Sequence, residues 1–294
     1  MARLANTLEA VAASASPRLR APPGATDCHM HVYGPEKSYP LAPTCPLQPP
    51  DAPVAVYEAL MRKLGIERTV VVQPSAYAAD NRRALDAVAE LGLDRARAVV
   101  VVEPGIDDAA LSDLTKRGAR GLRFHMLAGG ILPWSVLPDM AARVGDHGWH
   151  VQLQFDGREL TERFDRLKVL PGPVVIDHNG KFLEPVPPDH EAFKALLRLL
   201  ETGRFWVKVS APYETSRTGA PAYRDVDVLA RALIAAAPER VLWGTNWPHP
   251  NAQVDAPEDA ALLDLLLDWA DSDAIRERIL VDNPAALYGF ETGR

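Results

Sequence analysis

Short apolar runs alternate with longer amphipathic stretches along almost the whole chain. The apolar runs are rich in β-branched residues and lack a polar face, as in Thr69–Gln73 and Val174–His178. Such runs are typical of parallel strands that helices cover on both sides. The stretches between them carry acidic, Asn or Pro residues near their starts, which favour helix N-caps. The pattern therefore predicts repeated β–α units around a parallel sheet.

Eight strands and eight helical stretches are predicted. The strands cover Ala25–His31, Thr69–Gln73, Ala98–Val102, Gly121–His125, His150–Phe155, Val174–His178, Phe205–Val209 and Val241–Thr245. The helical patterns cover Val54–Leu64, Asn81–Leu91, Asp107–Arg117, Trp134–His147, Asp156–Leu170, Asp189–Glu201, Asp225–Ala237 and Pro257–Trp269.

Eight such units in 294 residues favour an α/β fold of the (β/α)8 TIM-barrel type. A doubly wound open sheet usually has a Gly-rich turn after its first strand. The first strand here ends in Asp-Cys-His-Met-His at His31, without such a turn. We predict an N-terminal lead-in segment over residues 1–22, with at most a short helix, and one single-domain barrel over residues 23–294.

The composition of the chain argues against some classes of binding partner. The net charge of −7 and pI of about 5.6 argue against nucleic acids and anionic membranes. Two cysteines, Cys28 and Cys45, are too few for a disulfide framework and suit a reducing compartment. No apolar run approaches the roughly 18 residues of a membrane span. We therefore expect a cytoplasmic protein with a small-molecule substrate and no nucleic-acid or membrane partner; the sequence does not indicate an oligomeric state.

Polar side chains gather where the predicted strands end, which is where TIM barrels carry their active sites. His29 and His31 are two residues apart on the first strand and so share one face. The other candidates are Ser75 and Tyr77 after the second strand, Arg123 on the fourth, Gln154 on the fifth, His178 on the sixth, Lys208, Tyr213 and Arg217 on and after the seventh, and Asn246 and His249 after the eighth. We interpret His125 and His150 as structural histidines.

Three motifs carry a family resemblance: Asp-x-His-x-His ending at His31, Ile-Asp-His ending at His178, and Trp-Gly-Thr-Asn-Trp-Pro-His ending at His249. Together they resemble the amidohydrolase superfamily, and within it the branch that contains 2-pyrone-4,6-dicarboxylate hydrolase and related lactonases. The resemblance extends from about Pro23 to Phe290. It implies a distorted TIM barrel of the amidohydrolase type that acts on small carboxylated lactones.

The resemblance also bears on cofactors. Metal-dependent members of the superfamily take ligands from the first-strand histidines, from the fifth and sixth strands, and from an Asp at the end of the eighth. Here Gln154 and Asn246 stand at two of these places. A metal would have only neutral imidazoles. We therefore expect no metal and no other cofactor; zinc bound by His29, His31 and His178 is the alternative.

Hydrolases of this branch carry Asp where this chain has Asn246, and use it as the general base towards water. An amide lacks that basicity. The loop Met126–Gly130 also lacks further arginines of the hydrolase pattern, so we interpret Asn246 as native rather than engineered. The chain is more similar to metal-independent isomerases of the branch, which convert D-galactaro-1,5-lactone into D-galactaro-1,4-lactone in galacturonate catabolism. A lactone hydrolase and a non-catalytic sugar-acid-binding barrel are the alternatives.

An isomerase of this kind needs no activated water, because the C4 hydroxyl of the lactone is held close to its C1 carbonyl. We expect Arg123, helped by Arg217 or Lys208, to hold the free carboxylate. The histidines His29, His31 and His178 would stabilise the oxyanion, with a protonated member supplying most of the effect. His178 or His249 would move the proton, Asn246 would orient the hydroxyl, and Ser75, Tyr77, Gln154 and Tyr213 would bind the rest of the substrate.

Overall fold

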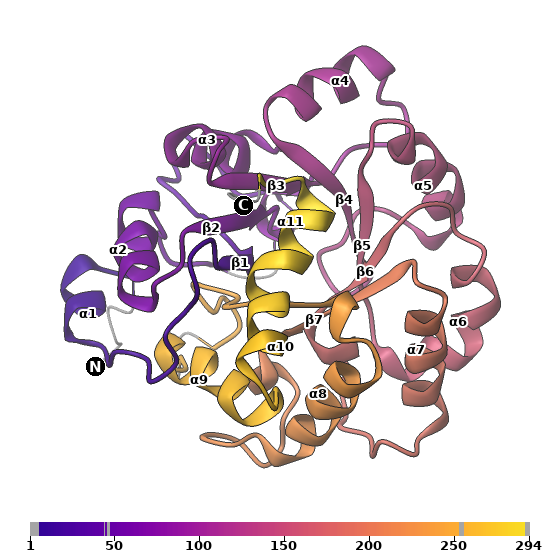
Figure 1. Ribbon diagram of the computed structural model, residues 1–294. Helices are drawn as coiled ribbons and strands as arrows, with labels where there is room; N and C mark the ends of the chain where they lie inside the picture. The colour runs from indigo at the N-terminus through magenta and orange to yellow at the C-terminus, as the bar shows by residue number, and fades with distance from the viewer. Residues whose placement is uncertain (1–5, 44, 46–47, 253–255, 292–294) are drawn as a thin grey trace.

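A computed structural model describes residues 6–43, 45, 48–252 and 256–291 and shows a barrel of parallel strands (Figure 1). The sheet has eight strands that neighbour one another in chain order. They are β1 (Thr26–Met30), β2 (Arg68–Val72), β3 (Ala96–Val100), β4 (Ala119–His125), β5 (His150–Gln154), β6 (Val174–Ile176), β7 (Phe205–Ser210) and β8 (Val241–Gly244). All eight predicted strands are confirmed, with ends that differ by at most two residues.

The helices alternate with the strands and surround the barrel (Figure 1). They are α1 (Leu8–Ala13), α2 (Val54–Leu64), α3 (Arg82–Leu91), α4 (Asp108–Lys116), α5 (Leu137–Gly145), α6 (Leu160–Leu167), α7 (Glu191–Glu201), α8 (Arg224–Ala236), α9 (Asp259–Trp269), α10 (Asp273–Glu277) and α11 (Asn283–Tyr288). Their apolar faces pack on the outside of the strands, as Phe193, Leu196 and Leu200 of α7 do. This burial provides the main favourable free energy of folding.

The C-terminal segment closes the amino-terminal end of the barrel, which the sequence pattern did not predict. Helices α10 and α11 cross the centre of the barrel in Figure 1. Tyr288 packs with apolar side chains from inside the barrel, among them Cys28 and Val70. Arg97, near the start of β3, donates hydrogen bonds to the carbonyl oxygens of Tyr288 and Gly289. The active-site end of the barrel is therefore the opposite, carboxyl end.

Strands β1 and β8 meet through the segments that carry the predicted site. The amide of Asn246 donates to the carbonyl of His29 at 2.7 Å. Thr245 donates from its amide at 3.0 Å and from its hydroxyl at 2.6 Å to the buried carboxylate of Asp27. Gly244 allows this approach, because a Cβ there would lie 2.7 Å from the Cβ of His29. Barrel closure thus fixes the first and eighth strand ends against each other.

The predicted lead-in segment forms helix α1, which packs against α2. Residues 1–5 of the predicted lead-in segment lie outside the described residues, as do residues 292–294 of the predicted barrel region. No described helix has the length and apolar composition needed to cross a bilayer.

His150 lies at the amino-terminal end of the barrel, 5.2 Å from Tyr288 between ring centroids. Burial lowers its pKa to about 3. The unfolded chain therefore binds one more proton at this residue between about pH 3 and pH 6.5, so stability falls as the pH falls. We predict that His150→Leu reduces the slope of unfolding free energy against pH by about 1.4 kcal/mol per pH unit in this range.

Urea unfolding at a series of pH values measures this slope. His190→Asn is the matched control, because His190 is exposed and its side chain caps α7, a role that Asn also fills. We expect the control to keep the wild-type slope. A wild-type slope in His150→Leu would contradict the assignment of a buried, neutral imidazole.

Candidate active site

The carboxyl ends of the strands surround a cavity of about 540 Å³. Seven of the predicted site residues line it: His31, Ser75, Arg123, Gln154, His178, Tyr213 and Asn246. Five further side chains with a hydroxyl, amide, imidazole, amine or carboxyl group in its wall had no predicted role in the chemistry: Tyr33, His125, Lys181, Glu214 and Asn251. His125 therefore belongs to the cavity, although its sequence context indicated a purely structural residue.

Three predicted histidines form one cluster. The ring centroid of His29 lies 5.0 Å from that of His31 and 4.6 Å from that of His178. His31 and His178 line the cavity, whereas His29 is fully buried. The Nδ1 atom of His31 lies 2.8 Å from the carbonyl oxygen of Val72. A carbonyl only accepts, so Nδ1 carries the proton and Nε2 of the neutral ring is an acceptor.

All three imidazoles are neutral near pH 7. Burial lowers the pKa of His31 to about 3. Burial, with the nearby Lys208 ammonium, lowers the pKa of His29 well below its usual value, and burial next to His29 does the same for the pKa of His178. The expectation of a protonated histidine in the cluster therefore does not hold, because desolvation disfavours the charged form. Positive charge in the site comes from lysine and arginine instead.

Lys208 lies inside the barrel and not in the cavity wall, which corrects its predicted contact with the substrate carboxylate. Its Nζ atom is 2.7 Å from Oε1 of Gln152, 3.2 Å from Nδ1 of His29 and 3.5 Å from Oδ1 of Asp177. Burial acts to raise the pKa of Asp177, but its neighbours, Lys208 first among them and then Arg123 and the hydrogen bond from Gln152, together outweigh burial, and the pKa lies below its usual value. Lys208 and Asp177 are therefore a buried ion pair.

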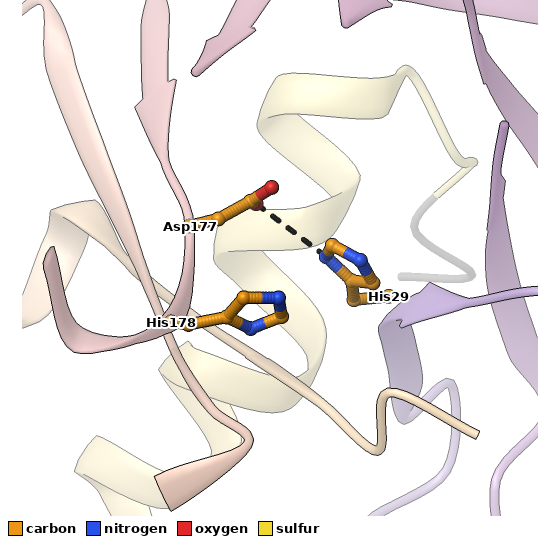
Figure 2. A group of neighbouring side chains, drawn as sticks. All are labelled: His29, Asp177 and His178. Atoms are coloured by element: carbon orange, nitrogen blue, oxygen red, sulfur yellow. Dashed lines mark ion pairs between the residues drawn. The ribbon is translucent and has the colours of Figure 1, made fainter. Parts of the chain in front are cut away.

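Figure 2 shows that His29, Asp177 and His178 converge from two sides of the barrel. Each offers one donor atom, and these atoms lie within 4.8 Å of one another. Oδ1 of Asp177 is 3.4 Å from Nδ1 of His29. The predicted zinc alternative, which relied on three histidines alone, overlooked this carboxylate.

Arg123 extends from β4 into the cavity wall, and 4% of it is exposed. Its Nη1 donates to the carbonyl of Gln73 at 2.7 Å, and its Nη2 donates to Oε1 of Gln154 at 2.7 Å. Its Nε has no partner within the described part of the chain. None of the Asp and Glu side chains that the structure describes forms an ion pair with it. Arg123 is thus a buried cation that still needs an anion.

Asn246 follows β8, and both N–H donors of its side-chain amide are engaged. Its Nδ2 donates to the hydroxyl of Tyr213 at 2.8 Å and to Oε1 of Glu214 at 2.9 Å. Glu214 is buried, forms an ion pair with Lys181, and also accepts from Asn251 at 3.1 Å. Although burial opposes ionisation, the charge and hydrogen bond of Lys181 lower the pKa of Glu214 to about 2. Glu214 is therefore a saturated anion and a poor base.

His178 and Asn246 share an unusual backbone conformation. Both lie in the left-handed region, with φ of 53° and 60°. This conformation is uncommon for residues other than glycine and costs on the order of 1–3 kcal/mol. It turns the chain sharply at the ends of β6 and β8, where both side chains reach the cavity wall. Strain of this kind concentrates at functional sites.

His249 is buried behind the cavity wall. Its Nε2 lies 3.1 Å from Oδ1 of Asp259, and its Nδ1 lies 2.9 Å from the hydroxyl of Tyr213. Because the carboxylate only accepts, Nε2 carries the proton and Nδ1 accepts from Tyr213. The structure therefore does not place His249 against a cavity ligand, as a direct proton carrier would need; it positions Tyr213.

Two further predicted substrate contacts do not fit their positions. The hydroxyl of Tyr77 accepts from the amide of Gly34 at 2.8 Å and does not line the cavity. The side chain of Arg217 is 70% exposed and pairs with Glu184 at 3.4 Å. Its backbone amide is held by Asp225 at 2.7 Å. Tyr77 and Arg217 therefore stabilise loops around the site.

Comparisons with known proteins agree with this geometry. The chain is 39% identical over 271 residues to D-galactarolactone isomerase of Agrobacterium fabrum, with 91% of each chain covered. It is also 39% identical over 282 residues to 2-pyrone-4,6-dicarboxylate hydrolase of Comamonas testosteroni, with 92% of each covered. A crystal structure of an Agrobacterium tumefaciens protein in its apo form superposes with a TM-score of 0.89 at 38% identity, covering 95% of this chain and 98% of that one.

The family follows from these similarities and from one further match. The sequence profile described as amidohydrolase matches residues 26–290, which contain all eight strands and every residue of the cavity wall named above. Relatives named as an isomerase and as a hydrolase are equally similar, so identity alone does not separate the two reactions. The chain belongs to the amidohydrolase family.

Proposed function

We propose that the protein is a metal-independent lactone isomerase that converts D-galactaro-1,5-lactone into D-galactaro-1,4-lactone. The observation that carries this proposal is Asn246, whose amide stands at the end of β8 and donates to Tyr213 and Glu214. A relative of 39% identity is named D-galactarolactone isomerase. The substrate class and the choice of isomerisation over hydrolysis are supported by separate features of the site.

The charges of the site support a lactone with one carboxylate. Lys181 is neutralised by Glu214, and Lys208 by Asp177. Among the described lysines and arginines of the site, this leaves Arg123 without a carboxylate partner. One excess positive charge matches a sugar-acid lactone that keeps a single free carboxylate, which a guanidinium binds well. A dicarboxylate would bring a second negative charge that these residues leave unpaired.

Weak bases in the cavity support isomerisation. The described residues that line it offer Glu214, with a pKa of about 2, His31, with a pKa of about 3, His125, with a pKa of about 4, and His178, whose pKa lies well below its usual value. Activation of water is poor with such bases, because general-base catalysis works best with a pKa near the operating pH. Attack by a hydroxyl of the substrate itself benefits from effective molarities of about 10⁵ M or more. The site therefore favours the intramolecular reaction.

The proposed reaction follows from these roles. The C4 hydroxyl attacks C1, the C1–O5 bond breaks, and the proton of the C4 hydroxyl is transferred to O5. Nε2 of His31, an acceptor in the cavity wall, takes this proton and returns it; so weak a base suffices here because the attacking hydroxyl is already held at C1. Arg123 holds the carboxylate, Asn246 and Ser75 orient the hydroxyls, and the buried charge of Lys208 adds positive potential near the oxyanion.

Turnover in water enriched in ¹⁸O tests the proposal. Isomerisation makes and breaks only bonds within the substrate, so the 1,4-lactone carries no label beyond that of an enzyme-free control. Lactone hydrolysis, the alternative that the similarity to 2-pyrone-4,6-dicarboxylate hydrolase suggests, places one ¹⁸O in the acid product. If labelled diacid is the main enzymatic product, the protein is a lactone hydrolase and the isomerase assignment is wrong.

A further inference from the structure

We propose that Lys208 is the built-in cation of this active site and excludes a divalent metal from the cluster of His29, Asp177 and His178. These three residues are of the types that hold metal ions, and their donor atoms lie within 4.8 Å of one another. The contacts of Lys208 determine whether these three residues can bind a metal ion. The inference rests on the proposed function only in assuming that turnover needs no metal.

Lys208 is held by hydrogen bonds to Gln152 and His29 and by the ion pair with Asp177. Its side chain and that of Asp177 are both fully buried. Nζ donates to Oε1 of Gln152, whose Nε2 in turn donates to Oδ2 of Asp177 at 3.0 Å. The ammonium therefore already compensates the charge of the carboxylate that would attract a metal ion. A divalent cation in the cluster would lie close to this ammonium in a site of low dielectric constant, where like charges repel strongly.

The hydrogen bond to His29 gives the second reason. An ammonium only donates, so Nδ1 of His29, 3.2 Å from Nζ, must accept. The neutral ring then carries its proton on Nε2, and neither nitrogen is free to bind a metal. A histidine that ligates a metal normally donates its other N–H to a carboxylate or carbonyl. His31 donates in this way, from Nδ1 to the carbonyl oxygen of Val72. His29 instead accepts at Nδ1, from the ammonium of Lys208.

Nε2 of His29 is also buried without a hydrogen-bond partner in the part of the chain that the structure describes. With the proton fixed there by Lys208, it is an unused donor within the histidine cluster. Lys208 thus acts as a positioning residue: it sets the tautomer of His29 and the charge of Asp177 together. The residues of this chain do not fit a metal as long as the ammonium is present.

Zinc binding by Lys208→Met tests the proposal, because methionine keeps most of the length of the unbranched side chain and removes its charge. After treatment with a chelator and dialysis against zinc, we expect wild type to retain little metal. Lys208→Met should retain about one zinc per chain, at least tenfold more than wild type. Adding His29→Ala to this variant should abolish the gain. Lys181→Met is the matched control, because it also breaks a buried ion pair but contacts neither His29 nor Asp177.

The tautomer of His29 provides a second measurement on the wild-type protein, which holds even if Lys208→Met does not fold. ¹⁵N NMR should show the proton of His29 on Nε2 and that of His31 on Nδ1. Stoichiometric zinc in wild type that is lost in His29→Ala, or a proton on Nδ1 of His29, would overturn the proposal. Neither readout depends on which lactone is turned over, so failure here is distinct from failure of the isomerase assignment.

Discussion

Replacing Arg123 with methionine is expected to lower kcat/KM for a carboxylated lactone by roughly 10²- to 10³-fold. The guanidinium is buried and has no carboxylate partner among the described residues, so the substrate anion completes its charge pairing. Removal of one member of a buried charge pair costs about 2–5 kcal/mol, and each 1.4 kcal/mol or so is a factor of ten. Initial-rate kinetics on the purified variants measure the loss.

Two comparisons make this result specific. Arg217→Met removes an arginine that pairs with Glu184 on the surface, and it should change kcat/KM less than twofold. A lactone without the carboxylate should react slowly with wild type and lose little further activity with Arg123→Met. An equal loss for the charged and uncharged lactones would show that Arg123 supports the fold of the site and does not bind the carboxylate.

Asn246→Asp together with Glu214→Gln is expected to turn the enzyme towards hydrolysis. The single change to Asp places a second carboxylate 2.9 Å from Glu214, and the repulsion keeps one of the two protonated. The double variant removes this conflict and leaves the introduced carboxylate ionised as a general base. General-base catalysis contributes about 10²- to 10⁴-fold. We expect the ratio of diacid to 1,4-lactone to rise about 10²-fold in the double variant and less in Asn246→Asp alone.

Asn251→Asp is the matched control for this experiment. Asn251 also donates to Oε1 of Glu214, at 3.1 Å, but it lies in the loop beyond the end of β8. The control should disturb Glu214 without creating a base at the strand end, so hydrolysis should stay at the wild-type level. A double variant that folds and still yields no diacid would contradict the view that an amide at position 246 suppresses hydrolysis.

The residues on the strands were predictable because strand geometry leaves few choices. Side chains alternate along a strand, so His29 and His31 had to share a face, and apolar runs without a polar side had to be covered on both faces. Residues in the loops beyond the strands follow no such period. Arg217 and Tyr77 were therefore misplaced, and Lys181 and Glu214, which define the electrostatics around Asn246, went unassigned. The sequence feature that could have identified Lys181 and Glu214 is their position a few residues after the end of a strand.

Depth inside the barrel was the second property that the sequence could not reveal. Lys208 has the same inward direction as the residues of the cavity wall, but it lies fully buried against Asp177. The neutral state of the histidines has the same origin, since desolvation depends on the packing of all eight strands and not on neighbours in sequence. The types of residue were predictable, and their protonation states were not.

Proton NMR of freshly generated D-galactaro-1,5-lactone, with chelator-treated enzyme and an enzyme-free control, tests the central claim most directly. The account predicts accelerated growth of 1,4-lactone signals without diacid, at a rate that added zinc does not increase. Accelerated formation of diacid would contradict the isomerase assignment. Activity that appears only after zinc is restored would contradict the metal-independent site built around Lys208.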